Sequence, residues 1–283
     1  KGEGLGNKFL GNIRECDAII HVIRCFDDDN VVREGGAPVD PAADKDTIDT
    51  ELQLKDLETI EGQLAKQEKM AASGNKEAKV LVDVLKAYKE VLDNARSVTF
   101  ERKEEQKAAH DLFLLTTKPV LYVCNVDETS AKSGNAYSKI IEDIAASEGA
   151  EAMVIAAKTE EDIASLDSYD DKKLFLDELG MSEPGVNRLI KKAYHLLNLQ
   201  TFITAGEMEV KAWTFQKGWK APQCAGVIHT DFEKGFIRAE VIKYDDYLKY
   251  GSEAAVREAG KLGIEGKEYE VQDGDIMHFR FNV

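Results

Sequence analysis

A short polar sequence follows an apolar stretch near the middle of the chain. Residues 119 to 128 read PVLYVCNVDE, an apolar run of the β-strand type that leads directly into Asn125, Val126, Asp127 and Glu128. An acidic side chain three residues after an Asn can accept hydrogen bonds from the donor edge of a purine, while the Asn fixes the loop or reaches the ring. Turns are also rich in Asn, Asp and Glu, so this pattern alone does not separate a base pocket from an ordinary turn.

A second loop supports the base-pocket interpretation. EAMVIAAK reads as another strand, and Ala156, Ala157 and Lys158 stand at its C-terminal end. Amphipathic helical patterns follow both strands, so they predict a parallel sheet whose ligands bind at the C-terminal strand ends. Backbone N–H groups of such a loop commonly complete a base pocket. We therefore expect nucleotide contacts from both loops.

The elements before these strands change character along the chain. Residues 1 to 26 read as loop, helix and the buried strand AIIHVIRCF, and residues 27 to 43 form an exposed connection rich in Asp, Gly and Pro. Two helices follow, over residues 44 to 72 and from residue 76. Their apolar residues form one stripe on each helix: Ile48, Leu52, Leu57, Ile60 and Leu64, then Leu81, Leu85, Tyr88 and Leu92. This predicts an antiparallel, coiled-coil-like hairpin, with a further helix over about residues 101 to 114.

The last segment, residues 198 to 283, has the pattern of a small mixed β domain. A hairpin, the strand FIRAEVIKY, a helix over about residues 246 to 261 and a closing strand fit a β-grasp, ubiquitin-like fold. Cations and rings alternate near its start: Lys211, Trp213, Phe215, Lys217, Trp219 and Lys220. Strand alternation places the first three on one face, which is expected to be core. The alternative is stacking and phosphate contact with RNA.

Composition restricts the class of protein. The chain has 283 residues and a formal net charge of −16, which argues against capture of nucleic acid by the whole surface. There is no apolar run of about 20 residues for a membrane helix and no signal peptide, so we expect a cytoplasmic protein, and we expect a monomer. The cysteines Cys16, Cys25, Cys124 and Cys224 are far apart, and the histidines lack ligand spacing; we expect reduced core thiols and no metal site in this chain.

Three long stretches together resemble one family. They are KGEGLGNKFLGNIRECDAIIHVIRCFDDDN, PVLYVCNVDE and AGEMEVKAWTFQKGWKAPQCAGVIHTDFEKGFIRAEVI. The sequence is similar over nearly its whole length to the Obg-like ATPase family, the YchF subfamily of the Obg-related P-loop GTPases. The resemblance implies an α/β P-loop NTPase-type sheet, with the following parts: residues 1–43, G domain with switch II; 44–114, helical insertion; 115–197, base-recognition half of the G domain; 198–283, TGS domain.

The resemblance also implies a nucleotide site. Asn125 and Val126 would contact adenine, and Glu128 would close the pocket. Val126 stands where GTPases of ordinary specificity have Lys, and Glu128 where they have Asp, a change that weakens guanine selection and fits the family's preference for ATP. No G-x-x-x-x-G-K-[ST] occurs in the sequence. By the resemblance, the phosphate loop and the Mg²⁺ ligands would precede Lys1, so we expect the chain to be N-terminally incomplete and inactive as an ATPase by itself.

Catalysis and partners follow from the same resemblance. Arg33 stands where many members have a His, but a guanidinium is no base at neutral pH, so no catalytic role is assigned to it. Ribosome association is implied through a groove between the TGS and helical domains, with RNA contacts expected at Lys211, Lys217, Trp219 and Lys220. Two alternatives stay open: an RNA- or ribosome-binding platform without catalysis, and a GTPase of ordinary guanine specificity.

Overall fold

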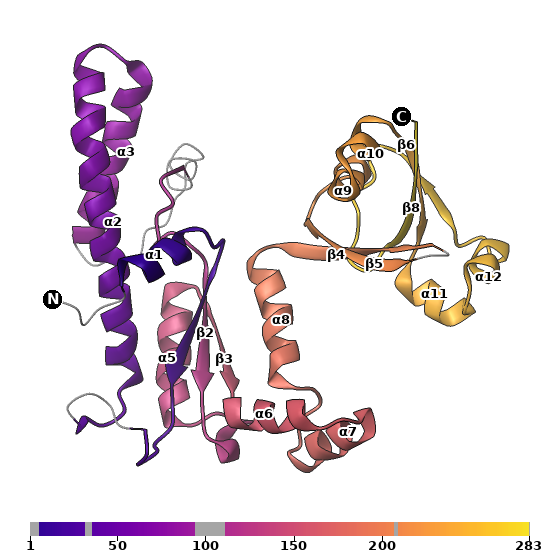
Figure 1. Ribbon diagram of the computed structural model, residues 1–283, viewed down its shortest axis with the longest axis horizontal. Coiled ribbons are helices and arrows are strands. Elements are labelled where there is room, and N and C mark those ends of the chain that lie inside the picture. The colour runs from indigo at the N-terminus through magenta and orange to yellow at the C-terminus, as the bar shows by residue number, and fades with distance from the viewer. Residues whose placement is uncertain (1–5, 32–35, 94–110, 207–208, 283) are drawn as a thin grey trace. The chain divides into compact units, whose positions relative to one another are not determined.

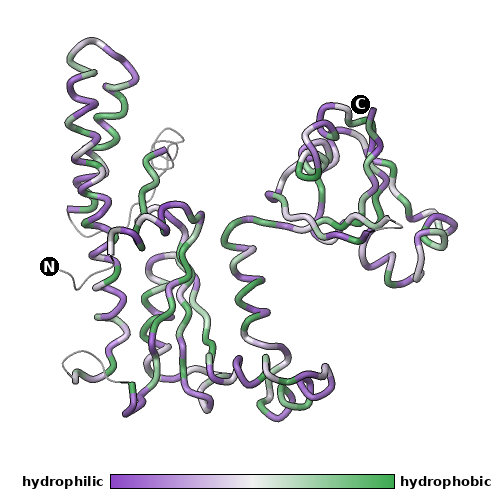
Figure 2. The backbone as a smooth tube through the Cα atoms, viewed as in Figure 1, coloured by the Kyte–Doolittle hydropathy of each residue, from purple (hydrophilic) through white to green (hydrophobic). Residues whose placement is uncertain are grey.

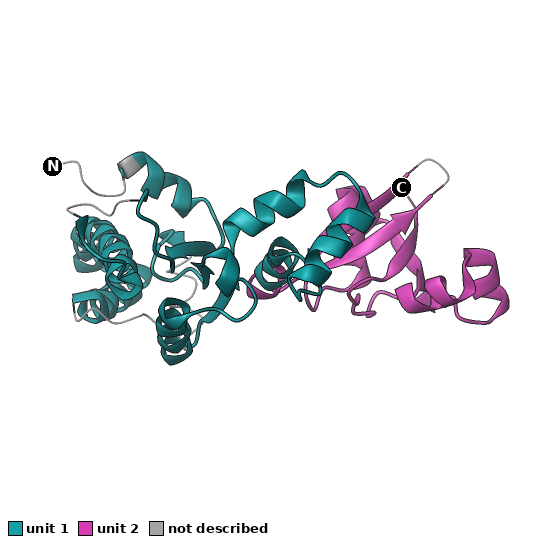
Figure 3. Ribbon diagram, turned by 90° about the horizontal axis from the view of Figure 1, so that it is seen from below, with its two compact units in different colours: residues 1–193 teal, residues 194–283 magenta. Residues whose placement is uncertain are grey.

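The chain folds into two compact units. The computed structural model describes the following residues: 6–31, 36–93, 111–206 and 209–282. Residues 1–193 form the first unit and residues 194–283 the second, as coloured in Figure 3. No described helix combines the length and the apolar character needed to cross a membrane.

The first unit contains a three-stranded parallel sheet, the helices packed against it and a long helical hairpin (Figure 1). Its elements are α1 (Asn7–Arg14), β1 (Ile19–Arg24), α2 (Pro41–Ala72), α3 (Lys76–Asp93), β2 (Val120–Asn125), the 3₁₀ turn η2 (Glu128–Ser130), α5 (Ala136–Glu148), β3 (Glu151–Ile155), α6 (Ala157–Ser165), α7 (Tyr169–Glu178) and α8 (Gly185–Leu196). The strand order is β1-β2-β3.

Strand β2 is central because it is apolar on both faces. Cys124 is opposite Ile23 of β1 and Val154 of β3 in a continuous parallel register. Successive residues of β2 are buried, as is typical of a strand covered on both sides. Strand β1 is buried on one face only, since Ile20 is 43% and Val22 61% exposed. The prediction of a fully buried first strand is therefore wrong for one face. Strand β1 is at the edge of the sheet, and no described helix covers the face that carries Ile20 and Val22.

Helices α2 and α3 form the predicted antiparallel hairpin. They meet at a turn where Gly74 has a φ of 97°, a left-handed conformation that favours glycine. The apolar residues between the two helices are Leu57, Ile60, Leu64, Leu81, Leu85, Tyr88 and Leu92. The predicted stripes therefore face each other, and the outer faces are mostly hydrophilic (Figure 2).

The beginning of α2 belongs to the core beside the sheet. This helix starts at Pro41 rather than at residue 44, with Asp40 as its N-cap. Ile48 and Leu52 pack in a cluster with Leu10 of α1, rather than against α3. One long helix therefore serves both the sheet and the hairpin.

The second unit is a five-stranded mixed sheet with helices. Its elements are β4 (Leu199–Ala205), β5 (Val210–Gln216), α9 (Ala221–Ile228), α10 (Thr230–Lys234), β6 (Phe236–Ile242), α11 (Tyr244–Tyr250), α12 (Glu253–Glu258), β7 (Gly263–Glu265) and β8 (Ile276–Phe281). The strand order is β5-β4-β8-β6-β7; β4 and β8 pair in parallel, with Ile203 opposite Ile276, and the other neighbouring strands pair antiparallel. This is the arrangement of the predicted β-grasp fold. Its core includes the fully buried Phe202, against which Cys224 and Ala225 of α9 pack.

Some elements differ from the prediction. The helix expected over residues 246 to 261 is two short helices, because Gly251 ends α11 in a left-handed conformation and Ser252 caps α12. Helices α7, α9 and α10 were not predicted. The second compact unit begins at Tyr194, and the domain boundary expected at residue 198 stays a prediction. Arg33 and most of the helix expected over residues 101 to 114 lie outside the described residues.

Candidate functional site

The residues predicted for the base pocket come together at one edge of the parallel sheet. Strand β2 ends at Asn125 and β3 ends at Ile155, and these two residues are opposite each other in the register. Helix α6 begins directly afterwards at Ala157. Figure 1 shows the C-terminal ends of β2 and β3 and the start of α6 at the same edge. The parallel register is thus what places the two predicted loops side by side.

The Asn125 side chain joins these two loops. Its Oδ1 accepts a hydrogen bond from the backbone N–H of Ala157 at 3.0 Å. Ala157 is the first residue of α6, and the residue before it, Ala156, offers no side-chain acceptor. The first N–H groups of a helix lack intrahelical acceptors, so Asn125 supplies the missing cap from the neighbouring strand. Of the two roles considered for this Asn, the structure shows the one that fixes the loop.

The two acidic residues after Asn125 have different environments. Asp127 caps the turn η2, where its carboxylate accepts hydrogen bonds from the Thr129 hydroxyl and from the N–H and hydroxyl of Ser130. These bonds, with that from Thr129 first, lower the pKa of Asp127. Glu128 is exposed, and its carboxylate has no hydrogen bond or ion pair with the described residues. Asp127 therefore stabilises the turn, while Glu128 is available to a ligand.

Two of the predicted contact residues point into the core. Val126 is 3% and Ala156 2% exposed, and both belong to the cluster under the sheet edge. The Val126 N–H donates to the carbonyl of Ile155 at 2.9 Å. The side chain of Val126 thus supports the loop, and an adenine contact by this residue stays a prediction limited to its backbone.

Lys158 is the exposed member of the second loop. Its Nζ lies 3.5 Å from a carboxylate oxygen of Glu161 and 3.6 Å from one of Asp162. Those carboxylates, Asp162 first, raise the pKa of Lys158. With 63% of its side chain exposed, the ammonium group can exchange these weak partners for a ligand.

Two further polar residues, which the sequence analysis did not identify, hold this edge together. Asn135 Nδ2 donates to the carbonyl of Cys25 at 2.8 Å and so joins the start of α5 to the end of β1. The Glu160 carboxylate accepts hydrogen bonds from the N–H groups of Gly185 and Val186 at 2.7 and 3.0 Å. An Asn before a helix and a Glu in a first turn are recognisable capping signals, but the sequence does not show their distant partners.

The described residues form no metal centre. No three or more His, Cys, Asp or Glu side chains among them are placed to hold a metal ion. Cys25, Cys124 and Cys224 are buried free thiols, as predicted, but Cys16 is exposed, so its assignment to the core is wrong. It follows α1 at the surface, outside both sheets. The described part of the chain therefore does not supply the set of ligands that Mg²⁺ would need from protein alone.

The predicted RNA cluster in the second unit lies partly in the core. Phe215 is 2% exposed, and Trp213 packs against the same core with its Nε1–H donating to Thr204 Oγ1 at 2.8 Å. Lys211 Nζ lies 4.0 Å from the centre of the Trp213 ring, and the Phe202 ring is stacked with that ring at 6.4 Å. The core interpretation is therefore right for Trp213 and Phe215, and Lys211 is exposed above them.

The rest of this cluster follows β5 on the surface. Lys217 is exposed, while Trp219 is half-buried against the core of the unit. Lys220 is 48% exposed and forms an ion pair with Glu268. The cluster thus presents three cations to solvent, while its rings mainly pack inward.

Comparisons with known proteins agree with the architecture. The family model YchF-GTPase_C, described as "Protein of unknown function (DUF933)", matches residues 199–282. A solved structure, that of the Schizosaccharomyces pombe YchF GTPase, superposes with a TM-score of 0.85 and 34% sequence identity; the match covers 99% of this chain and 76% of that one.

Two curated relatives match the whole chain at higher sequence identity. Proteins named ribosome-binding ATPase YchF are 52% identical in Bacillus subtilis (strain 168), over 288 residues, and 48% identical in Escherichia coli O157:H7, over 285 residues. Each match covers 100% of this chain and 78% of the relative. Identity at this level, over both units and the hairpin between the strands, shows that the chain belongs to the YchF family.

Proposed function

We propose that this protein is a ribosome-associated ATPase that acts as a nucleotide-dependent switch, converting ATP and water to ADP and phosphate. The structural observation that supports the proposal is the hydrogen bond between Asn125 and Ala157, which joins the two predicted base-binding loops at the C-terminal ends of β2 and β3. Relatives about half identical to the chain are named ribosome-binding ATPases. The protein works in the cytoplasm as a monomer, and its hairpin and C-terminal TGS-type unit report the nucleotide state to the ribosome.

The base is held by the loops that follow β2 and β3. Asn125 fixes the second loop, Glu128 provides a free carboxylate at the mouth, and backbone groups from Ala156 to Lys158 complete the edge. Hydrogen-bonding discrimination falls steeply when an acceptor misses its donors. Glu128 in place of the usual Asp, and Val126 in place of Lys, therefore favour adenine over guanine. A GTPase is the second candidate, because the relative of known structure from Schizosaccharomyces pombe is named a GTPase.

Mg²⁺ accompanies ATP in this proposal as the counter-ion of its phosphates. A Mg²⁺ ion in nucleotide sites usually keeps several waters and takes few protein ligands. The described residues contain no cluster of His, Cys, Asp or Glu side chains placed to hold the ion.

Ribosomal RNA is the proposed partner of the exposed cations on the second unit. Lys211, Lys217 and Lys220 would contact phosphates, and the exposed part of Trp219 would pack against a base. A local patch of this kind is compatible with the net charge of −16, because binding depends on the charges at the contact.

Calorimetric titration of the full-length protein with Mg-ATP and Mg-GTP, in identical salt, tests the proposal. We expect ATP to bind more tightly than GTP, and Asn125→Ala to weaken ATP binding because the cap of α6 is lost. GTP binding about tenfold tighter than ATP would establish the GTPase alternative instead. No binding of either nucleotide would favour the interaction platform.

A further inference from the structure

The N-terminus of α8 receives its hydrogen-bond acceptor from another helix. Glu160, in the first turn of α6, accepts from the Gly185 N–H through Oε1 at 2.7 Å and from the Val186 N–H through Oε2 at 3.0 Å. Such N–H groups have no acceptor within their own helix, and a carboxylate is also favoured at the positive end of the helix dipole. Both oxygens of Glu160 are thus used in charge-assisted hydrogen bonds to one helix end.

Gly185 allows this close approach. A Cβ at this position would lie 2.7 Å from Glu160 Oε1 and 2.9 Å from Cγ1 of Ile155, the last residue of β3. Contacts this short do not occur between real side chains, so any larger residue would push the carboxylate or the strand end away. The glycine, a poor helix former, is therefore explained by the contact that it permits.

Side-chain hydrogen bonds connect helix α6 to two neighbouring elements. At its start, Asn125 accepts from Ala157, and one turn later Glu160 binds the beginning of α8. The helix has only nine residues, and a helix this short is marginal without tertiary contacts. Thr159 and Ile163 bury one side of α6. The two connections add fixed points at its N-terminal end, next to the loop from Ala156 to Lys158.

We propose that Glu160 is a positioning residue for the nucleotide pocket: by binding the start of α8, it holds α6 where the Ala157 N–H meets Asn125. The inference rests on the proposed function, since it takes residues 156–158 as the base side of the pocket. Glu160 acts through α6 and does not touch the nucleotide. Since α8 is followed by β4, the same carboxylate connects the pocket to the helix that leads into the second unit.

Amide hydrogen exchange in the full-length protein without nucleotide tests the positioning role. The experiment compares the wild type with Glu160→Ala and Glu160→Gln. Glu178→Ala, on the exposed surface of α7, is the control. We expect Glu160→Ala to speed exchange roughly tenfold at Gly185 and Val186, and also at Ala157, which Glu160 does not contact. Glu160→Gln, which retains an acceptor, should restore much of the protection, and the control should match the wild type. Faster exchange confined to Gly185 and Val186 would overturn the proposal.

A second variant keeps the Glu160 carboxylate but places a methyl group where that carboxylate lies. Gly185→Ala should displace Glu160 and again speed exchange at Ala157, which protects the test against a folding defect peculiar to Glu160→Ala. If both variants leave Ala157 unchanged, Glu160 only caps α8, and the positioning role is wrong.

ATP titration of the same proteins separates this proposal from the proposed function. We expect Glu160→Ala to weaken ATP binding about tenfold and Glu160→Gln to recover most of it. Wild-type protein that binds no ATP would refute the proposed function, while exchange at Ala157 would still decide the role of Glu160. Wild-type ATP affinity in Glu160→Ala, in a protein that does bind ATP, would overturn the inference.

Discussion

Asp56 of α2 accepts a hydrogen bond from the backbone N–H of Leu115 at 2.9 Å, although 59 residues separate them in the chain. The N–H and the hydroxyl of Thr116 bind the same carboxylate, each at 2.8 Å. Asp56 and Leu115 are both fully buried. Burial raises the pKa of Asp56, and the hydrogen bonds from Leu115 and Thr116 oppose that effect. This junction fixes the hairpin to the segment that leads into β2.

Removing the Asp56 carboxylate should therefore destabilise the first unit. We expect Asp56→Ala to lower the free energy of unfolding by about 2–4 kcal/mol, since two backbone N–H groups and a hydroxyl lose their acceptor in the interior. Asp46→Ala, an exposed position on the same helix, is the control. Urea denaturation, monitored by circular dichroism, measures the free energy of unfolding of both variants. Equal stability of the two would show that Asp56 does not anchor the hairpin.

Lys45 is a buried cation at the beginning of α2. Its side chain is 4% exposed and forms ion pairs with Asp49 at 2.6 Å and Glu148 of α5 at 2.7 Å. Tyr122 of β2 donates to the other oxygen of Glu148 at 2.9 Å. Burial alone would lower the pKa of Lys45, but the two carboxylates outweigh it and raise the pKa, so the side chain stays charged.

We expect Lys45→Ala to lower the free energy of unfolding by about 2–3 kcal/mol, because it leaves a partly buried carboxylate pair without its cation. Lys139→Ala is a matched control: its ion pair with Asp143 has the same spacing and a distance of 2.7 Å, but both side chains are 66% exposed. That variant should be indistinguishable from wild type in thermal melting. Similar losses in both proteins would contradict the role of burial.

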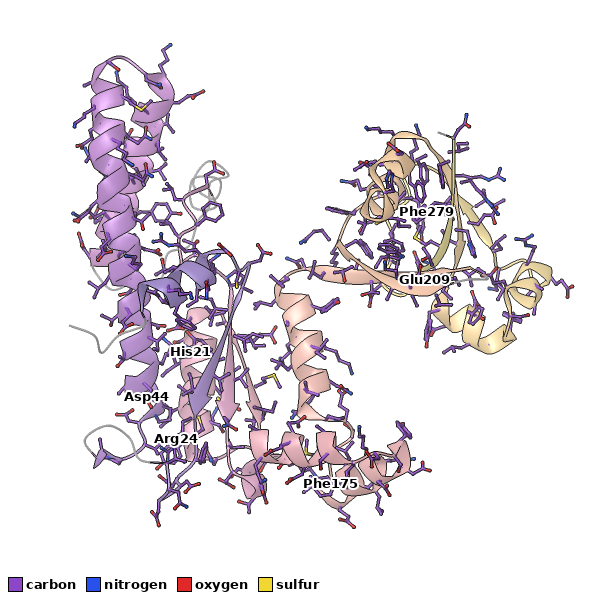
Figure 4. The ribbon with its side chains drawn as sticks, viewed as in Figure 1. His21, Arg24, Asp44, Phe175, Glu209 and Phe279 are labelled. Carbon is purple, nitrogen blue, oxygen red and sulfur yellow. The ribbon has the colours of Figure 1, made fainter. Side chains whose placement is uncertain are left out.

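The pH dependence of stability should include a contribution from His21 of β1 (Figure 4). Burial lowers its pKa below 6.5; Lys45 lowers it further, and Asp49 opposes both. Its ring lies 5.8 Å from that of Tyr122. Since the unfolded chain takes up this proton near pH 6.5 and the folded chain only at lower pH, the contribution is present above 6.5 and is lost as the pH falls.

Urea denaturation at several values between about pH 7.5 and 5.5 measures this effect. The free energy of unfolding of the wild type should decrease as the pH is lowered through this range. His21→Gln should make this dependence on pH less steep. His195→Gln, an exposed position, serves as the control. An unchanged slope in His21→Gln would exclude this residue as the source.

The proposed RNA contact can be tested by charge reversal on the second unit. The double variant Lys217→Glu, Lys220→Glu should cosediment less with ribosomes, because repulsion replaces attraction at the phosphates. Lys234→Glu with Lys261→Glu changes the net charge by the same amount at other exposed positions of this unit. If both double variants lose binding equally, the effect is one of net charge, and the patch has no specific role.

The strands and the hairpin were predictable because their signals are local. The continuous apolar run ending at Asn125 is typical of a buried strand, and the helical spacing of the stripes through Leu57 and Leu85 is typical of amphipathic helices. The observed strand β2 and the α2–α3 hairpin agree with both patterns. The helix around residue 251 was misjudged because one glycine conformation interrupts an otherwise helical pattern. Helices α9 and α10 have eight and five residues, too few for a clear period.

The site was predictable only where strand register decides it. Parallel pairing brings the ends of β2 and β3 together, so the neighbouring positions of Asn125 and Ala157 followed from the two strand predictions. The partners of Glu160 and Asp56 lie 25 and 59 residues away, and no local pattern specifies such contacts. The burial of Val126 was missed because a valine after a strand fits both a surface loop and the core.

The pairing of β4 with β8 has a consequence for the order in which the protein folds. These are the first and last strands of the second unit, joined at Ile203 and Ile276, so its central sheet cannot close until β8 has been synthesised. The α2–α3 hairpin closes over a short turn and can form early. During translation we expect β4 and β5 to form an incomplete sheet in which the edge of β4 that later pairs with β8 is exposed. Exposed strand edges of this kind are prone to aggregate.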